Sequence, residues 1–527
     1  MHKFNKNNLC FILFLCSFFC YSQDKIDWQN ALGGEVFETL EDIVQTENGY
    51  FLAGCTLLSG MTGDITEPPI GDEGSDFWFV RLDNQGEIIW DRVIGTSDFD
   101  FVKSVDYTND DGFIVIANNV ATSLSGDLTE VTNGSTDAWV FKLDAQGIIE
   151  WQNSFGGTDL DAPVYIEQTT DGGYITLIRS RSNISGDKTE NSQGGFDYWV
   201  VKLDESGVID WQNTIGGNGF DNPNTILQTP DGGYVVGGTS GSSVSGDKTE
   251  PNVGSIDLWV LKLDNQGAIE WQNTIGGPDS DSLNSLTLTQ DGGYILNSTS
   301  LSGIGGDKTE DSRGEQDYWV VKLSESGEIE WDKTLGGSDG DFGQSAVEFT
   351  NGNFVIGGFS ESDISGDKID ATNGGRDYWV LTLSPGGELL RQVAVGGDDT
   401  DQFIELLEET DGTAVLAGYS RSSLSGDKDE EQEGYWIVKL TEEALGIEDT
   451  QETISLNIYP NPAEAFLSVA TPKKILKYEI TNNVGQILIT KEFDNTTINV
   501  DELSRGIYYI RLYMDNNEQE VKRFVKS

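Results

Sequence analysis

Short runs of apolar and β-branched residues alternate with Gly- and Asp-rich connections along most of the chain. In one stretch the runs are the segment before Thr229, Tyr234 to Ser240, Asp257 to Asp264 and Ala268 to Gly276. The connections 230–233 and 265–267 have tight-turn compositions, because Gly and Asp tolerate the positive φ that hairpins need. No run repeats its apolar residues at the period of a helix. The stretch therefore predicts four short antiparallel strands.

The same pattern returns seven times along the chain. The first tryptophan of each copy recurs at a spacing of about 60 residues, at Trp78, Trp139, Trp199, Trp259, Trp319, Trp379 and Trp436. A fixed period of this kind indicates a repeat architecture, and a repeated unit of four antiparallel strands is typical of a β-propeller blade.

The two ends of the repeat array predict how the ring closes. Asp27 to Gly34 has the sequence of a fourth strand with nothing before it, and Tyr435 to Leu440 is a third strand with no fourth strand after it. Pairing of these segments removes the exposed sheet edges that would invite aggregation, whereas a linear solenoid would need polar caps. We expect an all-β, seven-bladed propeller of four-stranded blades over residues 24–440, closed by the N-terminal strand.

A second set of tryptophans marks the fourth strands, at Trp28, Trp90, Trp151, Trp211, Trp271 and Trp331. Large aromatic side chains at repeated positions predict packing between blades in preference to ligand binding. In the last copy Arg391 replaces the tryptophan. We expect that blade to be the least stable, or to be the one against which another segment docks.

The first 23 residues have the pattern of a secretory signal peptide. Lys3 and Lys6 precede an apolar run from Leu9 to Phe19, and Tyr21 to Gln23 follow it. The run is too short to span a bilayer as a helix. Cys20 leaves a lipoprotein signal as the alternative, although the residues before it are not small. We therefore expect export, and a soluble mature protein without a transmembrane segment.

Composition excludes several classes of chemistry. The single histidine is His2, and Cys55 is the only cysteine beyond residue 23. The expected mature chain therefore contains neither a Ser-His-Asp nor a Cys-His catalytic set, no histidine-bound metal and no internal disulfide. The net charge of −57 lies almost wholly before residue 454, because the remainder has nine acidic and nine basic residues. This charge disfavours nucleic acid and anionic lipid as partners. It is consistent with binding of divalent cations, or with a role in solubility alone.

Two loops of each repeat retain acidic residues. The loop after the fourth strand reads GGxDxD, and its last acid recurs at Glu38, Asp100, Asp161, Asp221, Asp281, Asp341 and Asp401. The connection between the second and third strands reads SGDKTE or similar, with its aspartate at Asp64, Asp127, Asp187, Asp247, Asp307, Asp367 and Asp427. In a four-stranded antiparallel blade these two loops emerge on the same face, so we expect two concentric rings of carboxylates there.

The acids have two interpretations. Each can accept hydrogen bonds from nearby backbone N–H groups and thereby fix its loop. Alternatively, the DxD pairs bind calcium, which prefers oxygen ligands and needs no histidine. The candidate metal ligands are Asp98, Asp100, Asp159, Asp161, Asp279, Asp281, Asp339, Asp341, Asp399 and Asp401. The spacing lacks the twelve-residue loop of an EF-hand.

The last part of the chain, residues 454–527, follows an acidic linker at 441–453 and carries several ordered motifs. They are Tyr459-Pro460-Asn461-Pro462, Asn483-Val484-Gly485-Gln486, Leu503 to Ile510 with Gly506 and Tyr508, and Val521 to Lys526. In order and spacing this segment resembles the C-terminal sorting domain of the type IX secretion system of Bacteroidetes. The resemblance implies a small Ig-like β-sandwich, recognition by the type IX machinery, and delivery to the cell surface or the medium. An ordinary Ig-like adhesion domain is the alternative.

Together these features predict a binding or scaffold protein at the cell surface, and we expect a monomer. The expected ligand is a glycan or a protein that meets the acidic, loop-rich face, where connections such as 240–256 vary between repeats. The alternative is an enzyme that acts on polysaccharides with paired carboxylates, a glycoside hydrolase or lyase. Among the repeated loop acids nothing marks one pair as different from its six equivalents, and we therefore assign no catalytic residue.

Overall fold

The computed structural model describes residues 25–57, 60–71 and 74–446, and most of 457–527 apart from short internal segments. The chain divides into two compact units after Gly446. The predicted signal peptide at 1–23 lies outside the described residues. No helix in the described part of the chain is long and apolar enough to cross a membrane.

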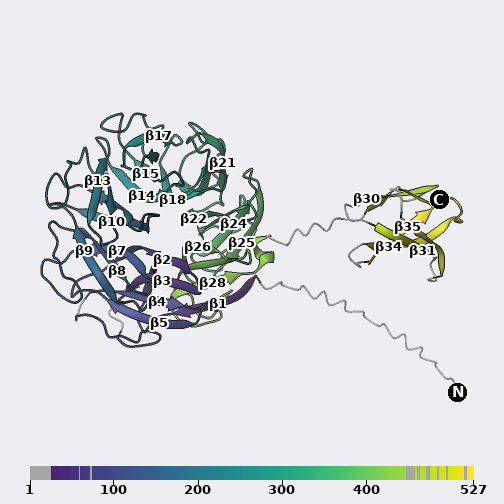
Figure 1. Cartoon of the computed structure of the whole chain (residues 1–527), viewed down its shortest axis with the longest axis horizontal. Helices are drawn as coiled ribbons and strands as arrows, with labels where there is room; N and C mark the ends of the chain where they lie inside the picture. The colour runs from purple at the N-terminus through teal and green to yellow at the C-terminus, as the bar shows by residue number, and fades with distance from the viewer. Residues whose placement is uncertain are drawn as a thin grey trace, which may run out of the picture. The chain divides into compact units, whose positions relative to one another are not determined.

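The first unit consists of seven four-stranded antiparallel sheets that follow one another around a ring (Figure 1). Blade 1 contains β2 (Glu38–Thr46), β3 (Gly49–Thr56), β4 (Asp76–Leu82) and β5 (Ile88–Ile94). Blade 2 contains β6 (Val102–Tyr107), β7 (Phe113–Asn119), β8 (Asp137–Leu143) and β9 (Ile149–Phe155). Blade 3 contains β10 (Asp161–Gln168), β11 (Tyr174–Ser180), β12 (Asp197–Leu203) and β13 (Ile209–Ile215).

The remaining blades repeat this order. Blade 4 contains β14 (Asp221–Gln228), β15 (Tyr234–Ser240), β16 (Asp257–Leu263) and β17 (Ile269–Ile275). Blade 5 contains β18 (Asp281–Leu288), β19 (Tyr294–Ser300), β20 (Asp317–Leu323) and β21 (Ile329–Leu335). Blade 6 contains β22 (Asp341–Glu348), β23 (Phe354–Ser360), β24 (Asp377–Leu383) and β25 (Leu389–Val395). The seven-bladed propeller predicted from the sequence is confirmed.

Blade 7 joins the two ends of the propeller. It contains β26 (Asp401–Glu408), β27 (Ala414–Ser420), β28 (Gly434–Leu440) and, from the N-terminal end, β1 (Ile26–Leu32). β1 pairs antiparallel with β28, and Ala31 lies opposite Trp436. Gln29 reinforces this pairing, because its Oε1 accepts from Trp436 Nε1 at 3.0 Å and its Nε2 donates to the Asp427 carbonyl at 2.8 Å. The predicted closure by the N-terminal strand is confirmed.

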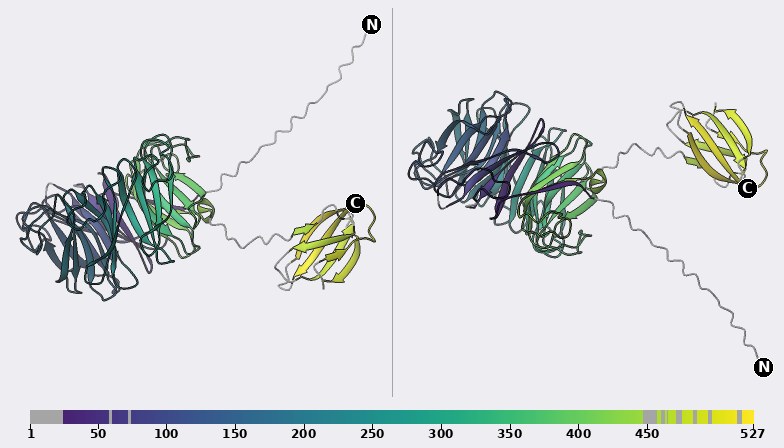
Figure 2. Two further views of the ribbon diagram at one scale, coloured as in Figure 1. Left: turned by 90° about the horizontal axis from the view of Figure 1, so that it is seen from above. Right: turned by 90° about the horizontal axis from the view of Figure 1, so that it is seen from below.

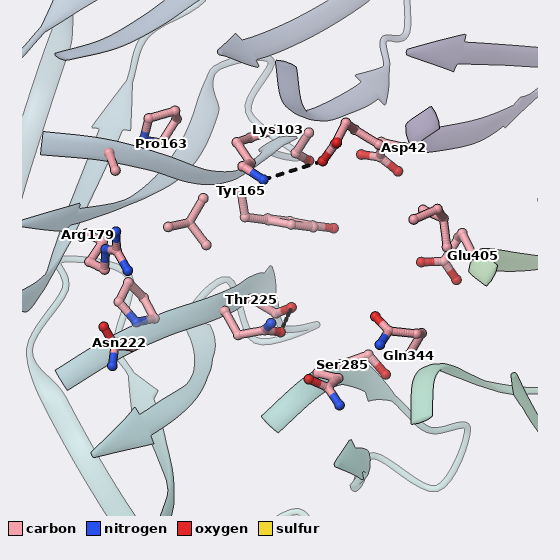
Figure 3. Close-up of a pocket in the computed structure, with 18 of the residues that line it drawn as sticks. Asp42, Lys103, Pro163, Tyr165, Arg179, Asn222, Thr225, Ser285, Gln344 and Glu405 are labelled. Carbon is pink, nitrogen blue, oxygen red and sulfur yellow. Dashed lines mark hydrogen bonds and ion pairs between the residues drawn. The ribbon is translucent and has the colours of Figure 1, made fainter. Parts of the chain in front are cut away.

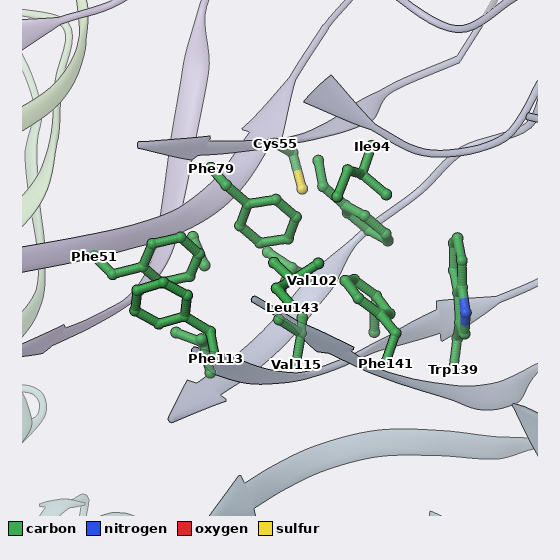
Figure 4. Packing of buried hydrophobic residues seen from close by; sticks show 14 of the residues in the cluster. Phe51, Cys55, Phe79, Ile94, Val102, Phe113, Val115, Trp139, Phe141 and Leu143 are labelled. Atoms are coloured by element: carbon green, nitrogen blue, oxygen red, sulfur yellow. The ribbon is translucent and has the colours of Figure 1, made fainter. Parts of the chain in front are cut away.

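Neighbouring blades pack through buried aromatic and aliphatic side chains. The seven third-strand tryptophans are fully buried. Between blades 1 and 2, Phe51 stacks on Phe113 with ring centroids 3.7 Å apart, and Phe79, Phe141 and Trp139 extend the cluster (Figure 4). In the edge-on views of Figure 2 the strands of successive blades run side by side. Burial of each such side chain contributes about 1.5–3 kcal/mol, so this packing dominates the stability of the ring.

The fourth-strand tryptophans are only half-buried, and each packs on the last turn of the next blade. Trp331 covers Gly387, and its Nε1 donates to the Pro385 carbonyl at 3.1 Å. Trp28 covers Gly86 in the same way, and a Cβ atom at Gly86 would lie 2.9 Å from the indole. Gly86 has a φ of 83°, so both its conformation and its contact require glycine.

The exception at Arg391 follows from the closure. The fourth strand of blade 6 faces blade 7, where β28 and β1 come from opposite ends of the chain and share no turn. The short helix α1 (Glu442–Leu445) occupies that place, and Gly446 packs on Arg391. Thr382 Oγ1 donates to the Leu445 carbonyl at 2.8 Å. A tryptophan at 391 would have no turn to cover, and another segment docks there, which was one of the two expectations.

The second unit contains two sheets. The strands β29 (Asn457–Tyr459), β30 (Phe466–Ala470) and β33 (Thr497–Asn499) form one sheet, and β31 (Ile475–Asn482), β32 (Ile487–Glu492), β34 (Gly506–Met514) and β35 (Gln519–Lys526) form the other. Leu467, Ile480, Ile510 and Phe524 are buried between them. The fold fits the predicted Ig-like domain. Tyr459 ends β29, Gly506 begins β34, and Tyr508 donates to the Ser504 carbonyl at 2.8 Å. Pro460, Asn461, Pro462 and Gly485 lie outside the described residues.

We predict that Gln29→Ala loosens the closure strand. The substitution leaves the buried Trp436 N–H without an acceptor, which costs about 1–3 kcal/mol. The matched control is Gln212→Ala, because Gln212 makes the same two bonds, to Trp199 and Asp187, within blade 3. Hydrogen exchange should show faster exchange of the β1 amides in Gln29→Ala only. Equal protection of β1 in both variants would contradict a closure that depends on this side chain.

We also predict unequal costs for two equivalent substitutions. Trp331→Ala should lower the free energy of unfolding of the propeller by about 2–3 kcal/mol, because it uncovers the turn of blade 6. Arg391→Ala should cost less than about 1 kcal/mol, as is usual for exposed positions. Urea unfolding followed by circular dichroism measures both values. An equal or larger cost for Arg391→Ala would show that this position carries the same packing as the tryptophans.

Candidate functional site

A cavity of about 610 Å³ lies on the propeller axis, within the ring formed by the first strands of the blades (Figure 3). Every blade contributes to its wall, mostly from its first strand, and the second strands of blades 2 and 3 add Asn118 and Arg179. The lining is predominantly polar. A concave site with converging polar groups is the usual form of a ligand pocket in proteins.

A β-bulge in each first strand shapes this wall. In β2 the pairing with β3 passes from Leu40 to Asp42, so Glu41 has no partner, and the same irregularity occurs in the other six blades. A bulge directs two consecutive side chains towards one side of the strand. The unpaired residues, which line the cavity, are Glu41, Lys103, Val164, Asn224, Asn284, Gln344 and Ile404.

The residues that follow the bulges form a second ring. They are Asp42, Ser104, Tyr165, Thr225, Ser285, Ser345 and Glu405. Tyr165 is the only aromatic member, and its side chain extends across the cavity towards Asp42 and Glu405 (Figure 3). Burial and the nearby carboxyls of Glu167, Asp106, Asp42 and Glu405 raise the pKa of Tyr165 well above its usual value. The phenol is therefore neutral and can donate a hydrogen bond.

Two carboxyls of this ring titrate near neutrality. Burial, together with the charge of Glu405, raises the pKa of Asp42 to about 7, although its oxygens accept from the Ile43 and Val105 N–H groups, each at 2.8 Å. Burial raises the pKa of Glu405 to about 7, while Ser345 Oγ and the Leu406 N–H donate to it. Beside them Lys103 Nζ lies 3.4 Å from Glu41. The wall formed by blades 7, 1 and 2 therefore holds the carboxyls of the cavity, with Lys103 beside them.

The acid ring predicted from GGxDxD is structural. Glu38 and its six aspartate equivalents are buried, and each accepts from a backbone N–H four residues earlier, at 2.5–3.0 Å. Asp161, for example, also accepts from Ser180 and Ser182, at 2.5 and 2.7 Å. These acids hold the loop that enters each blade, as the first of the two interpretations predicted.

The second predicted ring connects neighbouring blades. In every blade the SGD aspartate accepts at Oδ2 from the N–H of a glycine in the preceding blade, at 3.0–3.3 Å. The aspartate N–H donates back to the carbonyl of the same glycine at 2.8–3.0 Å. The glycines follow the fourth strands and the aspartates lie between the second and third strands, so the two loops meet on one face of the propeller, as expected.

The structure does not bring the members of the DxD pairs together around a shared point. The second members, Asp100, Asp161, Asp281, Asp341 and Asp401, are buried and bonded as described. Asp98, Asp279, Asp339 and Asp399 are exposed, and Asp159 pairs with Arg181 at 2.6 Å. Among the described residues no group of three or more His, Cys, Asp or Glu side chains is placed to hold a metal. Calcium binding stays a prediction, and a comparison of melting temperatures in chelator and in calcium would test it.

The axial cavity was not anticipated from the sequence. The signal that could have located it is the contrast between neighbouring positions of the first strand. The acid at its start is retained in seven copies, whereas the bulge position three residues later carries Glu, Lys, Val, Asn, Asn, Gln and Ile in chain order. Without the bulge, the period of a strand does not place these residues on the axis.

We predict that stability falls as the pH rises from 5 to 8. A carboxyl whose pKa is about 4 in the unfolded chain and about 7 in the fold binds its proton more tightly when folded, so its contribution is present at low pH and is lost through pH 7. Glu405→Gln should reduce the difference in free energy of unfolding between pH 5 and pH 8 by about 1–3 kcal/mol. The exposed Glu325→Gln is the control. A pH dependence unchanged in Glu405→Gln would contradict the assignment.

Several solved structures are distantly similar to this chain. Hydrazine synthase of Kuenenia stuttgartiensis matches at 10% identity and a TM-score of 0.39 over 67% of this chain and 80% of that chain. PorZ, a surface component of the type IX secretion system of Porphyromonas gingivalis, matches at 9% identity and a TM-score of 0.23 over 95% of this chain and 100% of that chain.

Sequence comparison adds one curated relative and one family. The regulatory protein FlaEY of Caulobacter vibrioides is 23% identical over 80% of this chain, which spans 46% of that protein's length. Residues 457–527 match the family model described as the secretion system C-terminal sorting domain. The chain therefore carries the sorting domain of a type IX secretion cargo protein, which implies export to the cell surface or secretion.

Proposed function

We propose that this protein is an exported carbohydrate-binding protein whose ligand occupies the axial cavity. The sorting domain supports delivery to a surface or a medium where polysaccharides are available. The proposal keeps the glycan alternative of the sequence interpretation, but moves the ligand from the acidic loops to the cavity.

The observation that carries the proposal is the loss of seven-fold repetition at the cavity wall. Elsewhere the repeats retain the residues that fold and join the blades, such as the buried third-strand tryptophans and the SGD aspartates. At the bulges the seven copies differ in charge, size and polarity. Stability alone requires no such difference, because the same backbone accepts all these residues. An asymmetric ligand would require it.

The chemistry of the wall suits a carbohydrate. Five amide side chains line the cavity, at Asn118, Asn222, Asn224, Asn284 and Gln344. An amide carries both donors and acceptors, as the hydroxyls of a sugar require, although Asn284 Nδ2 already donates to Thr299 and to the Gly343 carbonyl. Tyr165 adds an aromatic face across the lumen, against which the C–H face of a sugar ring can pack. Such a mixture of one aromatic ring and many neutral polar groups matches hydroxyl-rich ligands better than apolar ones.

One observation favours a second function, hydrolysis or elimination of polysaccharide by paired carboxyls. Asp42 and Glu405 are neighbours in one ring, and the pKa of each is about 7, which is the range useful for proton transfer. Both oxygens of Asp42, however, already accept backbone hydrogen bonds. This function therefore stands second to binding.

We predict that Tyr165→Ala weakens binding to the glycan that a glycan array selects by several-fold to about tenfold, because the stacking face is lost. Calorimetric titration of the full chain measures the affinity. The control is Asn265→Ala, which alters an exposed turn between β16 and β17.

Three outcomes decide between the functions. Binding that Tyr165→Ala weakens and Asn265→Ala leaves unchanged supports the proposal. An array that shows no bound glycan, or an affinity that Tyr165→Ala leaves unchanged, contradicts it. Release of new reducing ends or unsaturated sugars from the bound glycan, lost in Glu405→Gln, would replace binding with catalysis.

A further inference from the structure

Arg179 breaks the repeat at the cavity wall. It lies in β11, next to the first strand of blade 3, where it pairs with Ala162. The equivalent residues of the other blades are Cys55, Asn118, Thr239, Thr299, Phe359 and Tyr419. Blade 3 therefore places a cation where no other blade has one, in a chain that carries 89 acidic and 32 basic residues.

The guanidinium of Arg179 is incompletely paired. Its Nε is buried, and no hydrogen-bond acceptor contacts that atom among the described residues. No ion pair to Arg179 is found in the described part of the chain. Burial lowers its pKa, and no neighbouring carboxyl opposes that effect. Arg181, two residues further along, has its partner in Asp159 at 2.6 Å.

The packing holds Arg179 in place despite the missing partner. Its guanidinium lies over the ring of Phe196, with the Cζ atom 4.6 Å from the ring centroid. Figure 3 shows the side chain at the wall of the cavity near Asn222, whereas Asp42 and Glu405 lie on the other side of Tyr165. The cavity therefore has a cationic side at blade 3 and a carboxyl side at blades 1 and 7.

Arg179 as a whole is only partly buried, but its buried Nε has no acceptor. A buried donor without an acceptor costs stability, and proteins retain such a group where a function requires it. A guanidinium is suited to an anionic group, because it offers two parallel N–H donors to a carboxylate or a sulfate.

We propose that Arg179 forms an anion subsite of the axial cavity, and that the ligand is an acidic carbohydrate with its carboxylate or sulfate on Arg179. This inference rests on the proposed carbohydrate function and specifies its substrate class. The neutral part of the sugar then lies along Tyr165 and the amide side chains.

The test compares sugars with and without their anionic groups on the same sugar backbone. Tetragalacturonate and its fully methyl-esterified form are titrated into the full chain by calorimetry, and a sulfated galactan oligosaccharide and its desulfated form provide the second pair. We expect the wild-type protein to bind one acidic member at least tenfold more tightly than its neutral partner. The pair that shows the preference identifies the anion as carboxylate or sulfate.

Variants assign the preference to one residue. Arg179→Gln should abolish the ratio between the acidic and neutral forms while leaving affinity for the neutral form within about twofold. Its melting temperature should change little, because Arg179 is only partly buried and its Nε has no hydrogen bond to lose. Arg181→Gln, directly after β11, is the control, and it should retain the ratio.

The remaining outcomes separate failure of the subsite from failure of the function. Equal affinity for charged and neutral forms in the wild-type protein, or a ratio that survives Arg179→Gln, overturns the anion subsite while the carbohydrate function stands. A lack of binding to all four sugars, together with an empty glycan array, overturns both.

Discussion

Packing stabilises the ring, but the spacing of its blades depends on a reciprocal pair of hydrogen bonds that joins each blade to the next. A glycine after the fourth strand donates to the side chain of an SGD aspartate in the following blade and accepts from the N–H of the same aspartate. At the closure Gly33, which follows β1, makes this pair with Asp64, and Gly396 makes it with Asp427. All seven junctions therefore have the same local geometry, including the two that flank the non-covalent closure. Equal junctions fix the angle between blades, and that angle fixes the width of the axial cavity.

This constraint separates the positions that must repeat from those that are free to differ. Glu38 and its aspartate equivalents, the SGD aspartates and the buried tryptophans lie at contacts that every junction needs. The bulge residues line the lumen and take no part in the hydrogen-bond pairs that join the blades. Their backbone is set by the bulge and not by the side chain, so Glu41, Val164 and Gln344 occupy equivalent places without strain. Seven positions around the axis can therefore vary without changing the fold. The proposed ligand specificity requires substitutions only at these positions.

The fold could be predicted from the sequence because its determinants are local or repeated. Turn glycines and strand runs predict the four-stranded blade, and its repetition predicts the number of blades. The unmatched segments at Trp28 and Trp436 predict the closure of the ring. The site could not be predicted in the same way. The DxD acids were predicted as metal ligands because they recur in the repeats. Asp161 and its equivalents recur because their carboxylates accept the hydrogen bonds that fix a loop. Tyr165 and Arg179 occur once each, and only the bulge and the pairing of Arg179 with Ala162 place them at the same cavity. Arg391 is a second example. A tryptophan at this position would pack on a turn between the last two strands of blade 7, and the closure leaves that blade without such a turn.

The charge of the protein bears on how the cavity can select a ligand. A chain with a net charge of −57 repels anions at long range, but exposed charges are screened beyond about 8–10 Å in salt. Inside the cavity the field comes from a few groups instead. The near-neutral pKa of Asp42 and Glu405 means that these carboxyls carry only part of their charge at neutral pH, which limits their repulsion of an anion bound across the lumen. Arg179 keeps its charge, since a guanidinium is not deprotonated in proteins. The cavity can therefore attract an anionic group at blade 3 although the surface around it is acidic.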